Sequence, residues 1–206
     1  MNQLSPELSY VVVSISIVLL SLTVHEAAHA WTANRLGDPT ARQLGRISLN
    51  PLVHIDLIGT VILPLLAAIS NLPIIGWAKP VPVDTRRLRQ PRRDFMLVAA
   101  AGPASNILLA VGGSILIRLL SIPTFGRSPW LEFVEINILL AVFNLVPIPP
   151  LDGGNVLAGL LPPAPAATFN SLRPFGFIIL YALMFTGTLS AIIMPPARVL
   201  WSLLIS

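Results

Sequence analysis

Two histidines and a glutamate stand within the five residues HEAAH, at positions 25–29. If this stretch is helical, His25 and His29 lie on one face, because residues i and i+4 of an α-helix are stacked one turn apart. Two imidazoles at that spacing can bind a single zinc ion, and Glu26 beside them can act as a general base toward water. The pattern therefore predicts a hydrolytic zinc site.

The same stretch follows an apolar run, YVVVSISIVLL at residues 10–20, which is long enough to enter a bilayer. The chain of 206 residues is 54% hydrophobic and 11% charged, whereas soluble domains carry about 25% charged residues. It is therefore predicted to be an integral membrane protein. A charged side chain at the bilayer centre costs roughly 2.5–3.5 kcal/mol on insertion scales, so these residues need a role. Metal binding is one; the alternative is a pair of packing histidines with Glu26 paired to an arginine.

A catalytic zinc site needs a third protein ligand and a position open for water. The candidates share a zinc-binding side chain and a place in or beside the apolar segments: His54, Asp56, Asp94, Glu132, Glu135 and Asp152. Asp152 has the most unusual setting, because prolines in NLVPIPPLDGG (144–154) stop the preceding helix and Gly153–Gly154 permit a sharp turn. Broken backbone at membrane depth is tolerated only where it is buried or lines a wet cavity. The alternative is a helix-capping aspartate in a surface turn.

Three motifs together resemble the site-2 proteases, a family of intramembrane zinc metalloproteases: HEAAH, AGPASN (101–106) and NLVPIPPLDGG. NPLVHIDLIGT (50–60) and GWAKPVPVD (76–84) are similar to its compact bacterial branch, which lacks PDZ and CBS domains. The resemblance implies one zinc ion per chain on His25, His29 and Asp152, with Glu26 as the catalytic base. It also implies that Asn144 assists catalysis beside the substrate or oxyanion, and that Asn106 positions substrate. The alternative for both asparagines is a hydrogen bond between helices.

These residues need a scaffold that is predicted to be all-α, a polytopic helical bundle forming one membrane domain over residues 1–206. The expected helices are three core spans and one accessory span, at 9–36, 94–120, 131–150 and 174–194. Gly37 suits the C-terminal end of the first helix. The alternating sequence AKPVPVD predicts either a short β segment near 77–84, restricted to a sheet edge by its prolines, or an extended segment.

The direction of the helices constrains the segment at 52–70. His25 and Asp152 each lie near the C-terminal end of a span, so both reach one zinc ion only if those spans cross in the same direction. Residues 94–120 supply the return crossing, and a further full crossing by 52–70 would separate the ligands. Because this segment is short and contains Gly59 and Pro64, we predict that it is re-entrant or shallow.

Basic residues support the same topology. In this arrangement most of them fall on one side, which the positive-inside rule assigns to the cytoplasm: Arg35, Arg42, Arg46, Lys79 and the arginines of 86–93. The net charge of +4 is therefore interpreted as a topology signal and not as a nucleic-acid-binding surface. The chain has no cysteine, which excludes disulfides and thiolate metal ligands.

Together these patterns predict a zinc metalloendopeptidase that hydrolyses peptide bonds in or near transmembrane helices of membrane-anchored substrates. Its partners would be a transmembrane substrate and the lipid bilayer, and the resemblance implies a bacterial plasma membrane with the active site open to the cytoplasm. The sequence does not predict an oligomeric state. One alternative is a membrane metal-binding or transport protein, although transporters usually contain paired broken helices or repeats and have no need of Glu26. Another is an inactive substrate-binding relative, although all four expected site residues are present.

Overall fold

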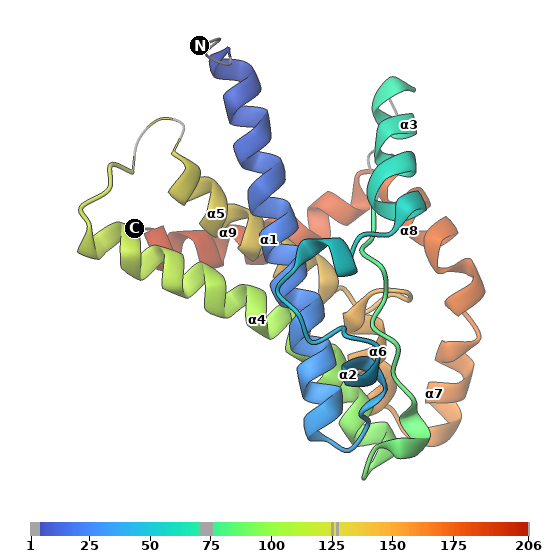
Figure 1. Ribbon diagram of the computed structural model, residues 1–206. Helices are drawn as coiled ribbons and strands as arrows, with labels where there is room; N and C mark the ends of the chain where they lie inside the picture. The colour runs from blue at the N-terminus through green and yellow to red at the C-terminus, as the bar shows by residue number, and fades with distance from the viewer. Residues whose placement is uncertain (1–4, 71–75, 125, 127, 206) are drawn as a thin grey trace.

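The computed structural model describes residues 5–70, 76–124, 126 and 128–205. Three helices form the centre of the fold: α1 (Pro6–Arg35), α4 (Pro91–Leu119) and α5 (Pro129–Asn144), with α4 packed against both of the others. Helices α1 and α5 run in the same general direction, and α4 runs back in the opposite one (Figure 1). This is the arrangement that a site shared by the ends of α1 and α5 requires.

Helix α1 has well-defined ends. The Ser5 side chain accepts a hydrogen bond from the Leu8 backbone N–H at 3.2 Å, which caps the N-terminus. At the other end Gly37 has a φ of +115°, a conformation that glycine adopts easily. The 30 residues between them span about 45 Å at 1.5 Å per residue. Helix α1 covers nearly all of the residues predicted for the first span, and one face of its C-terminal half is buried, including His25, His29, Ala30 and Ala33.

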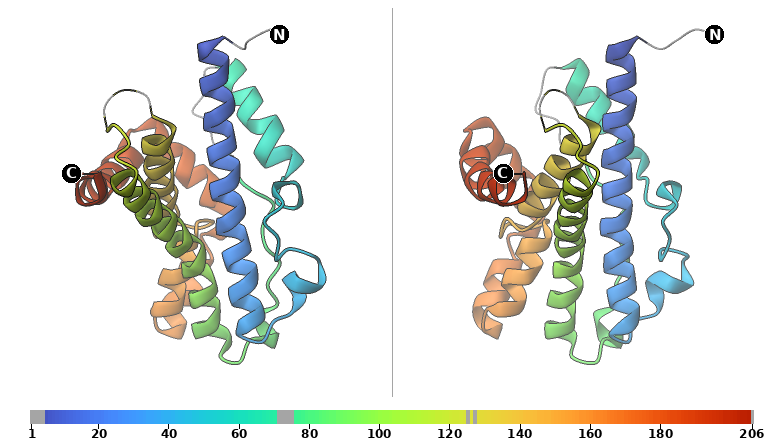
Figure 2. Two further views of the ribbon diagram at one scale, coloured as in Figure 1. Left: turned by 60° about the vertical axis from the view of Figure 1, so that its left-hand side comes forward. Right: turned by 90° about the vertical axis from the view of Figure 1, so that its left-hand side faces the viewer.

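Residues 57–70 rise beside α1, and residues 76–84 run in the opposite direction beside the first part of this segment (Figure 2). The rising limb consists of a π-helical turn η2 (Leu57–Ile62) and helix α3 (Leu63–Ile69). Two backbone hydrogen bonds join it to the returning limb, from Trp77 N–H to Gly59 O at 3.2 Å and from Lys79 N–H to His54 O at 2.8 Å. A side chain at position 59 would collide with the Trp77 indole at 2.4 Å, so glycine permits this approach. The rising limb therefore begins, and the returning limb ends, toward the same end of the bundle, as predicted for a re-entrant segment.

Of the two alternatives predicted near 77–84, the structure has the extended segment and not the β segment. Residues 76–84 run extended, and the part of the chain that the structure describes contains no strand. Pro80 and Pro82 have no N–H to donate to a ladder, and the neighbouring limb is helical, so it offers no strand edge.

Two buried side chains anchor this extended segment instead. The guanidinium of Arg46 donates to the backbone carbonyls of Val53 and Lys79. Asp38 accepts from the Asp84 backbone N–H at 2.7 Å. Arg46 and Asp38 therefore hold the segment at both ends against the loop that follows α1.

The C-terminal half contains α6 (Asp152–Leu160), α7 (Pro163–Asn170), α8 (Gly176–Phe185) and α9 (Thr188–Ile205). The accessory helix expected over 174–194 is divided, because the chain turns at Gly187, where φ is +72°. Helix α9 continues through Pro195–Pro196 and packs on α5. Short turns complete the described elements: α2 (Thr40–Gln43), η1 (Pro51–Val53), η3 (Thr85–Arg87) and η4 (Arg173–Phe175).

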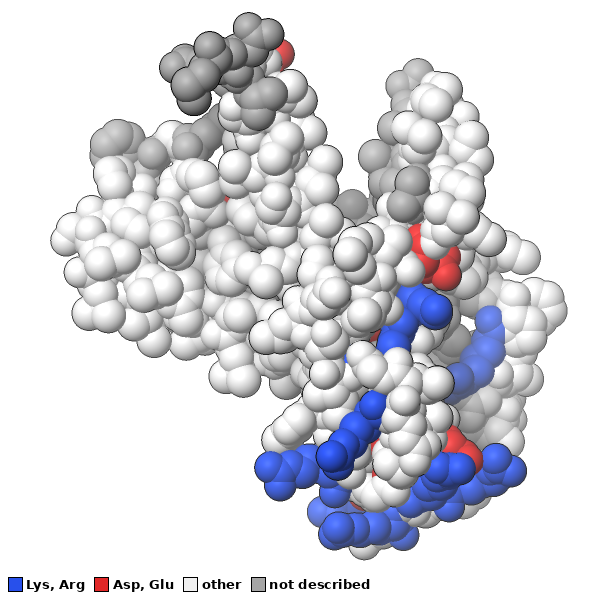
Figure 3. All heavy atoms as spheres, viewed as in Figure 1, with Lys and Arg blue, Asp and Glu red and all other residues white. Residues whose placement is uncertain are grey.

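The protein is built to cross a membrane. Four helical stretches among the described residues are long and apolar enough to span one: Glu7–Arg35, Pro91–Leu119, Pro163–Phe185 and Thr188–Ile205. Helix α5, with 16 residues, is only about 24 Å long. Lysines and arginines gather at the end of the molecule where α1 finishes (Figure 3).

Candidate metal centre

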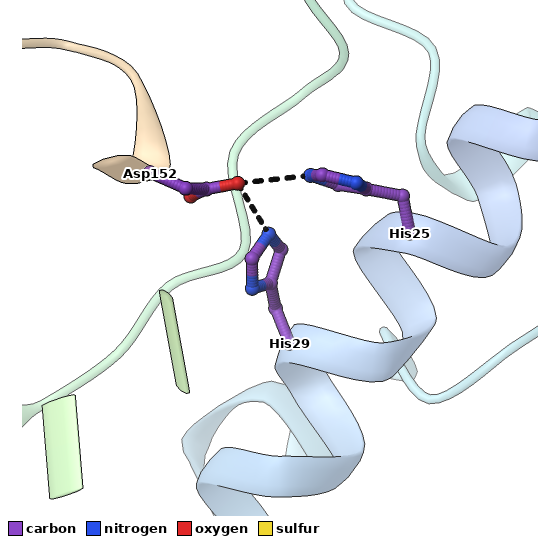
Figure 4. Close-up of side chains that lie close together, drawn as sticks. All are labelled: His25, His29 and Asp152. Carbon is purple, nitrogen blue, oxygen red and sulfur yellow. Dashed lines mark hydrogen bonds and ion pairs between the residues drawn. The ribbon is translucent and has the colours of Figure 1, made fainter. Parts of the chain in front are cut away.

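Three of the residues singled out in the sequence meet in the interior. Nε2 of His25 lies 3.1 Å from Oδ2 of Asp152, and Nε2 of His29 lies 3.3 Å from the same oxygen (Figure 4). Helix α1 presents both imidazoles on one face, and the start of α6 presents the carboxylate. Among the described residues this is the one group of three or more His, Cys, Asp or Glu side chains with metal-binding geometry.

The other nitrogen of each imidazole is held by the protein. Nδ1 of His29 donates to the backbone carbonyl of Val98 at 2.7 Å, and Nδ1 of His25 lies 2.6 Å from Oδ1 of Asn106. Both acceptors belong to α4. With the proton on Nδ1, each Nε2 directs a lone pair toward Asp152, which is the usual orientation of metal-binding histidines.

Asp152 reaches the site because the chain breaks sharply after α5. Helix α5 ends at Asn144, and α6 begins at Asp152 itself. We expected Gly153–Gly154 to make a sharp turn, but neither has a positive φ. Their role is close packing, since a Cβ at Gly153 would lie 2.2 Å from the Leu145 carbonyl oxygen and one at Gly154 would lie 2.8 Å from Pro149 N. The glycines let α6 fold back against the turn before it.

The remaining carboxylates and the third histidine lie elsewhere. His54 binds the Ser48 carbonyl through Nε2 at 2.9 Å, and Asp56 accepts from the Gly59 N–H at 2.7 Å. Asp94 accepts from the Gln90 N–H at 2.8 Å. Glu132 and Glu135 belong to α5 near its N-terminus, away from the end that approaches the site. Of the six candidates for a third ligand, the fold brings Asp152 to the histidines.

A cavity of about 490 Å³ opens in front of the three side chains. Glu26 and Asn144 lie on its wall, and its apolar lining includes Val81 of the extended segment, Phe143 of α5 and Phe177 of α8. Asn106 does not belong to this wall, since it is fully buried behind His25. The arrangement combines a polar centre with apolar walls.

The donor set and the space beside it fit a zinc ion. Two histidines and one carboxylate form a known catalytic zinc set, and the adjoining cavity leaves room for a further ligand. Position 102 of α4 is a glycine, and a Cβ there would lie 2.4 Å from Nε2 of His29 and 2.5 Å from Nε2 of His25. The space beside both nitrogens is therefore open because residue 102 has no side chain.

We expect Gly102→Ala to reduce zinc affinity at least about tenfold, because the methyl group displaces imidazoles whose orientation their Nδ1 bonds define. Gly112→Ala in the same helix is the matched control, since a Cβ there meets nothing within 4 Å. Chelator competition on both purified variants measures the effect. Equal affinities in the two variants would contradict the assignment of this space to a metal.

Sequence reasoning missed Asn137 of α5. This side chain is fully buried and bonds Asn106, the partner of His25. One signal for it was present, because Asn137 is an uncharged polar residue inside the apolar run INILLAVF, and polar groups within membrane helices usually face a neighbouring helix.

Comparison with known proteins places this site in context. The family model described as peptidase family M50 matches residues 126–183, which include Asn144 and Asp152. YwhC of Bacillus subtilis is 36% identical over 189 residues, covering 86% of this chain and 82% of the relative. Rip2 of Mycolicibacterium smegmatis is 34% identical, covering 89% and 71%, and Rip2 of Mycobacterium tuberculosis is 33% identical, covering 84% and 66%. Each of these relatives carries the name "Putative zinc metalloprotease". No solved structure matches the chain significantly.

Proposed function

This chain belongs to peptidase family M50, and from that membership we propose that it is an intramembrane protease whose zinc ion is held by His25, His29 and Asp152. The family is zinc-dependent, and the apolar helices identify a membrane protein. One observation carries the assignment: His25 and Asp152, 127 residues apart in the sequence, meet beside a cavity that Glu26 also lines.

In this proposal Glu26 is the general base. Zinc, when bound, supplies a Lewis acid that polarises the scissile carbonyl and the attacking water. Glu26 follows His25 directly on α1 and is half-buried at the cavity wall, where its carboxylate can take a proton from water and deliver it to the leaving amine. A metal-transport protein using the same ligands would have no need of this carboxylate.

Asn144 is proposed to assist at the developing oxyanion. One N–H of its side-chain amide donates to the Leu140 carbonyl at 2.9 Å, which fixes the amide at the end of α5. A primary amide has two N–H donors, so the second can serve the substrate oxygen in the cavity.

The proposed substrates are membrane-anchored proteins cleaved in or near a transmembrane helix. The apolar cavity walls support this, and so does the depth of the site within α1, whose apolar half precedes the histidines. A helix must unwind before its carbonyls can be attacked. The extended residues 78–83, which border the cavity, could then bind the unwound strand by backbone pairing.

The site is proposed to open toward the cytoplasm. His29 lies six residues before Arg35 at the end of α1, and the basic residues gather at this end of the molecule (Figure 3). Lysine and arginine are enriched in cytoplasmic loops. Water would then reach the cavity from that side.

Metal removal tests the proposal. We expect the purified chain in detergent to hold one zinc ion and to cleave a single-span substrate, and a chelator to abolish cleavage until zinc is restored. Metal analysis and gel electrophoresis of the products measure this. Full cleavage by metal-free protein would contradict the proposal, and bound zinc without cleavage of any of several single-span substrates would favour a metal-binding or inactive protein.

A further inference from the structure

Three fully buried polar side chains from three helices meet behind His25: Ser21 of α1, Asn106 of α4 and Asn137 of α5. Nδ2 of Asn106 donates to Oδ1 of Asn137 at 2.9 Å, and Nδ2 of Asn137 donates to Oγ of Ser21 at 2.9 Å. Burying such groups costs free energy unless they are hydrogen-bonded, and removing one side chain leaves the groups that bonded to it buried without a partner. The three side chains therefore act as one unit.

Two backbone carbonyls determine the direction of every bond in this unit. The carbonyl of Phe133 accepts from Nδ2 of Asn137 at 2.8 Å, and that of Ser21 accepts from Nδ2 of Asn106 at 3.3 Å. A carbonyl only accepts, so each amide nitrogen must face its carbonyl and each amide oxygen must face the other way. Oδ1 of Asn137 then faces Asn106, and Oδ1 of Asn106 faces His25.

This orientation of the Asn106 amide determines which nitrogen of His25 carries the proton. Oδ1 of Asn106 lies 2.6 Å from Nδ1 of His25, and it can only accept, so Nδ1 carries the proton. Nε2 is then free to direct its lone pair at the proposed zinc position. If the Asn106 amide turned over, its N–H would face Nδ1, and the proton would belong on Nε2, where it would block metal binding.

We propose that Asn137 is a positioning residue for His25, acting through Asn106 to fix the amide that selects the metal-binding form of the imidazole. The inference rests on the proposed function, because it requires His25 to be a zinc ligand. Asn137 does not line the cavity, so its effect reaches the metal through the two bonds to His25.

Zinc affinity of the full chain in detergent, measured by competition with a chromophoric chelator, tests this. We expect Asn137→Ala to weaken zinc binding about 10–100-fold, the usual range for loss of an outer hydrogen-bond partner. Asn137→Asp should stay within about threefold of wild type, since a carboxyl at this fully buried position is neutral, so that its O–H can donate to the Phe133 carbonyl while its other oxygen accepts from Nδ2 of Asn106. Ser114→Ala is the control, because it removes a different buried bond of α4, from Ser114 Oγ to the Leu204 carbonyl, and should leave zinc affinity unchanged.

A double-mutant cycle separates positioning from general stability. If Asn137 acts through Asn106, then Asn137→Ala should change zinc affinity less than about twofold once Asn106→Ala is present, because coupled residues are not additive. Additive losses would overturn the inference. If Asn137→Ala does not fold, ¹⁵N shifts of His25 in zinc-loaded wild type decide the matter, since a proton on Nε2 would contradict the proposed orientation.

His25→Ala distinguishes this inference from the proposed function. If His25→Ala loses zinc while Asn137→Ala binds it like wild type, the inference fails and the ligand set stands. If His25→Ala also binds zinc like wild type, the proposed ligand set itself is wrong.

Discussion

Glu26→Gln is expected to retain zinc and to lose cleavage by about 10²–10⁴-fold, the range for removal of a general acid–base group. Glutamine has nearly the same shape as glutamate but cannot accept a proton at neutral pH, and Glu26 is not one of the three proposed ligands. The variant should therefore separate metal binding from catalysis. Metal content and single-turnover cleavage, measured on the same purified sample, report both quantities.

The matched control is Glu135→Gln, the same change at an exposed position of α5. It should cleave like wild type. Undiminished cleavage by Glu26→Gln would exclude Glu26 as the base. Loss of zinc together with activity would instead make Glu26 part of the metal site, and the division of roles proposed for HEAAH would be wrong.

Asp152→Asn is expected to weaken zinc binding by more than about 100-fold. Loss of a residue that only hydrogen-bonds to a metal ligand costs up to about 100-fold in affinity, and this change removes the negative charge of a proposed ligand itself. Asparagine preserves the size of the side chain, so the packing of α6 against the turn should survive. Cleavage should fall in parallel, since the metal is lost. Chelator competition measures the affinity, and thermal unfolding of the metal-free protein measures whether the fold is intact.

Asp56→Asn provides the comparison, since Asp56 caps η2 through the Ile58 and Gly59 N–H groups and asparagine is an equally good cap. It should bind zinc like wild type. Unchanged zinc binding by Asp152→Asn would remove the third ligand from the proposal. The argument that the ends of α1 and α5 must lie together to share a metal would then lose its basis.

Much of the molecule could be predicted from the sequence because the relevant signals are local or concern the whole chain. Four-residue spacing places His25 and His29 on one face of any helix, whatever surrounds it. Composition favours a membrane environment, because 11% of the residues are charged, whereas soluble domains carry about 25%. The re-entrant segment followed from a count of crossings, which needs only the direction of each helix.

Where the sequence suggested a local role, packing sometimes decided otherwise. The alternating residues near 77–84 predicted an edge strand or an extended segment, and the segment is extended because a strand needs a neighbouring strand, whereas the fold places a helical limb and the Arg46 guanidinium there. Gly153–Gly154 looked like a turn, whereas the fold uses their missing side chains for close approach to the Leu145 carbonyl. In both cases the short sequence pattern does not specify which residues pack beside it.

By itself, then, the sequence determined a helical membrane protein with a paired-histidine site on its first long helix. The setting of Asp152 and the family resemblance singled it out among six candidates, but only the tertiary structure shows that it lies beside the histidines, because it is 127 residues from His25 along the chain and meets it through the packing of α1, α4 and α6. The same is true of Asn137, whose contact with Asn106 depends on how α4 and α5 pack. Contacts between distant segments depend on how whole helices pack, and neither spacing nor composition encodes that packing.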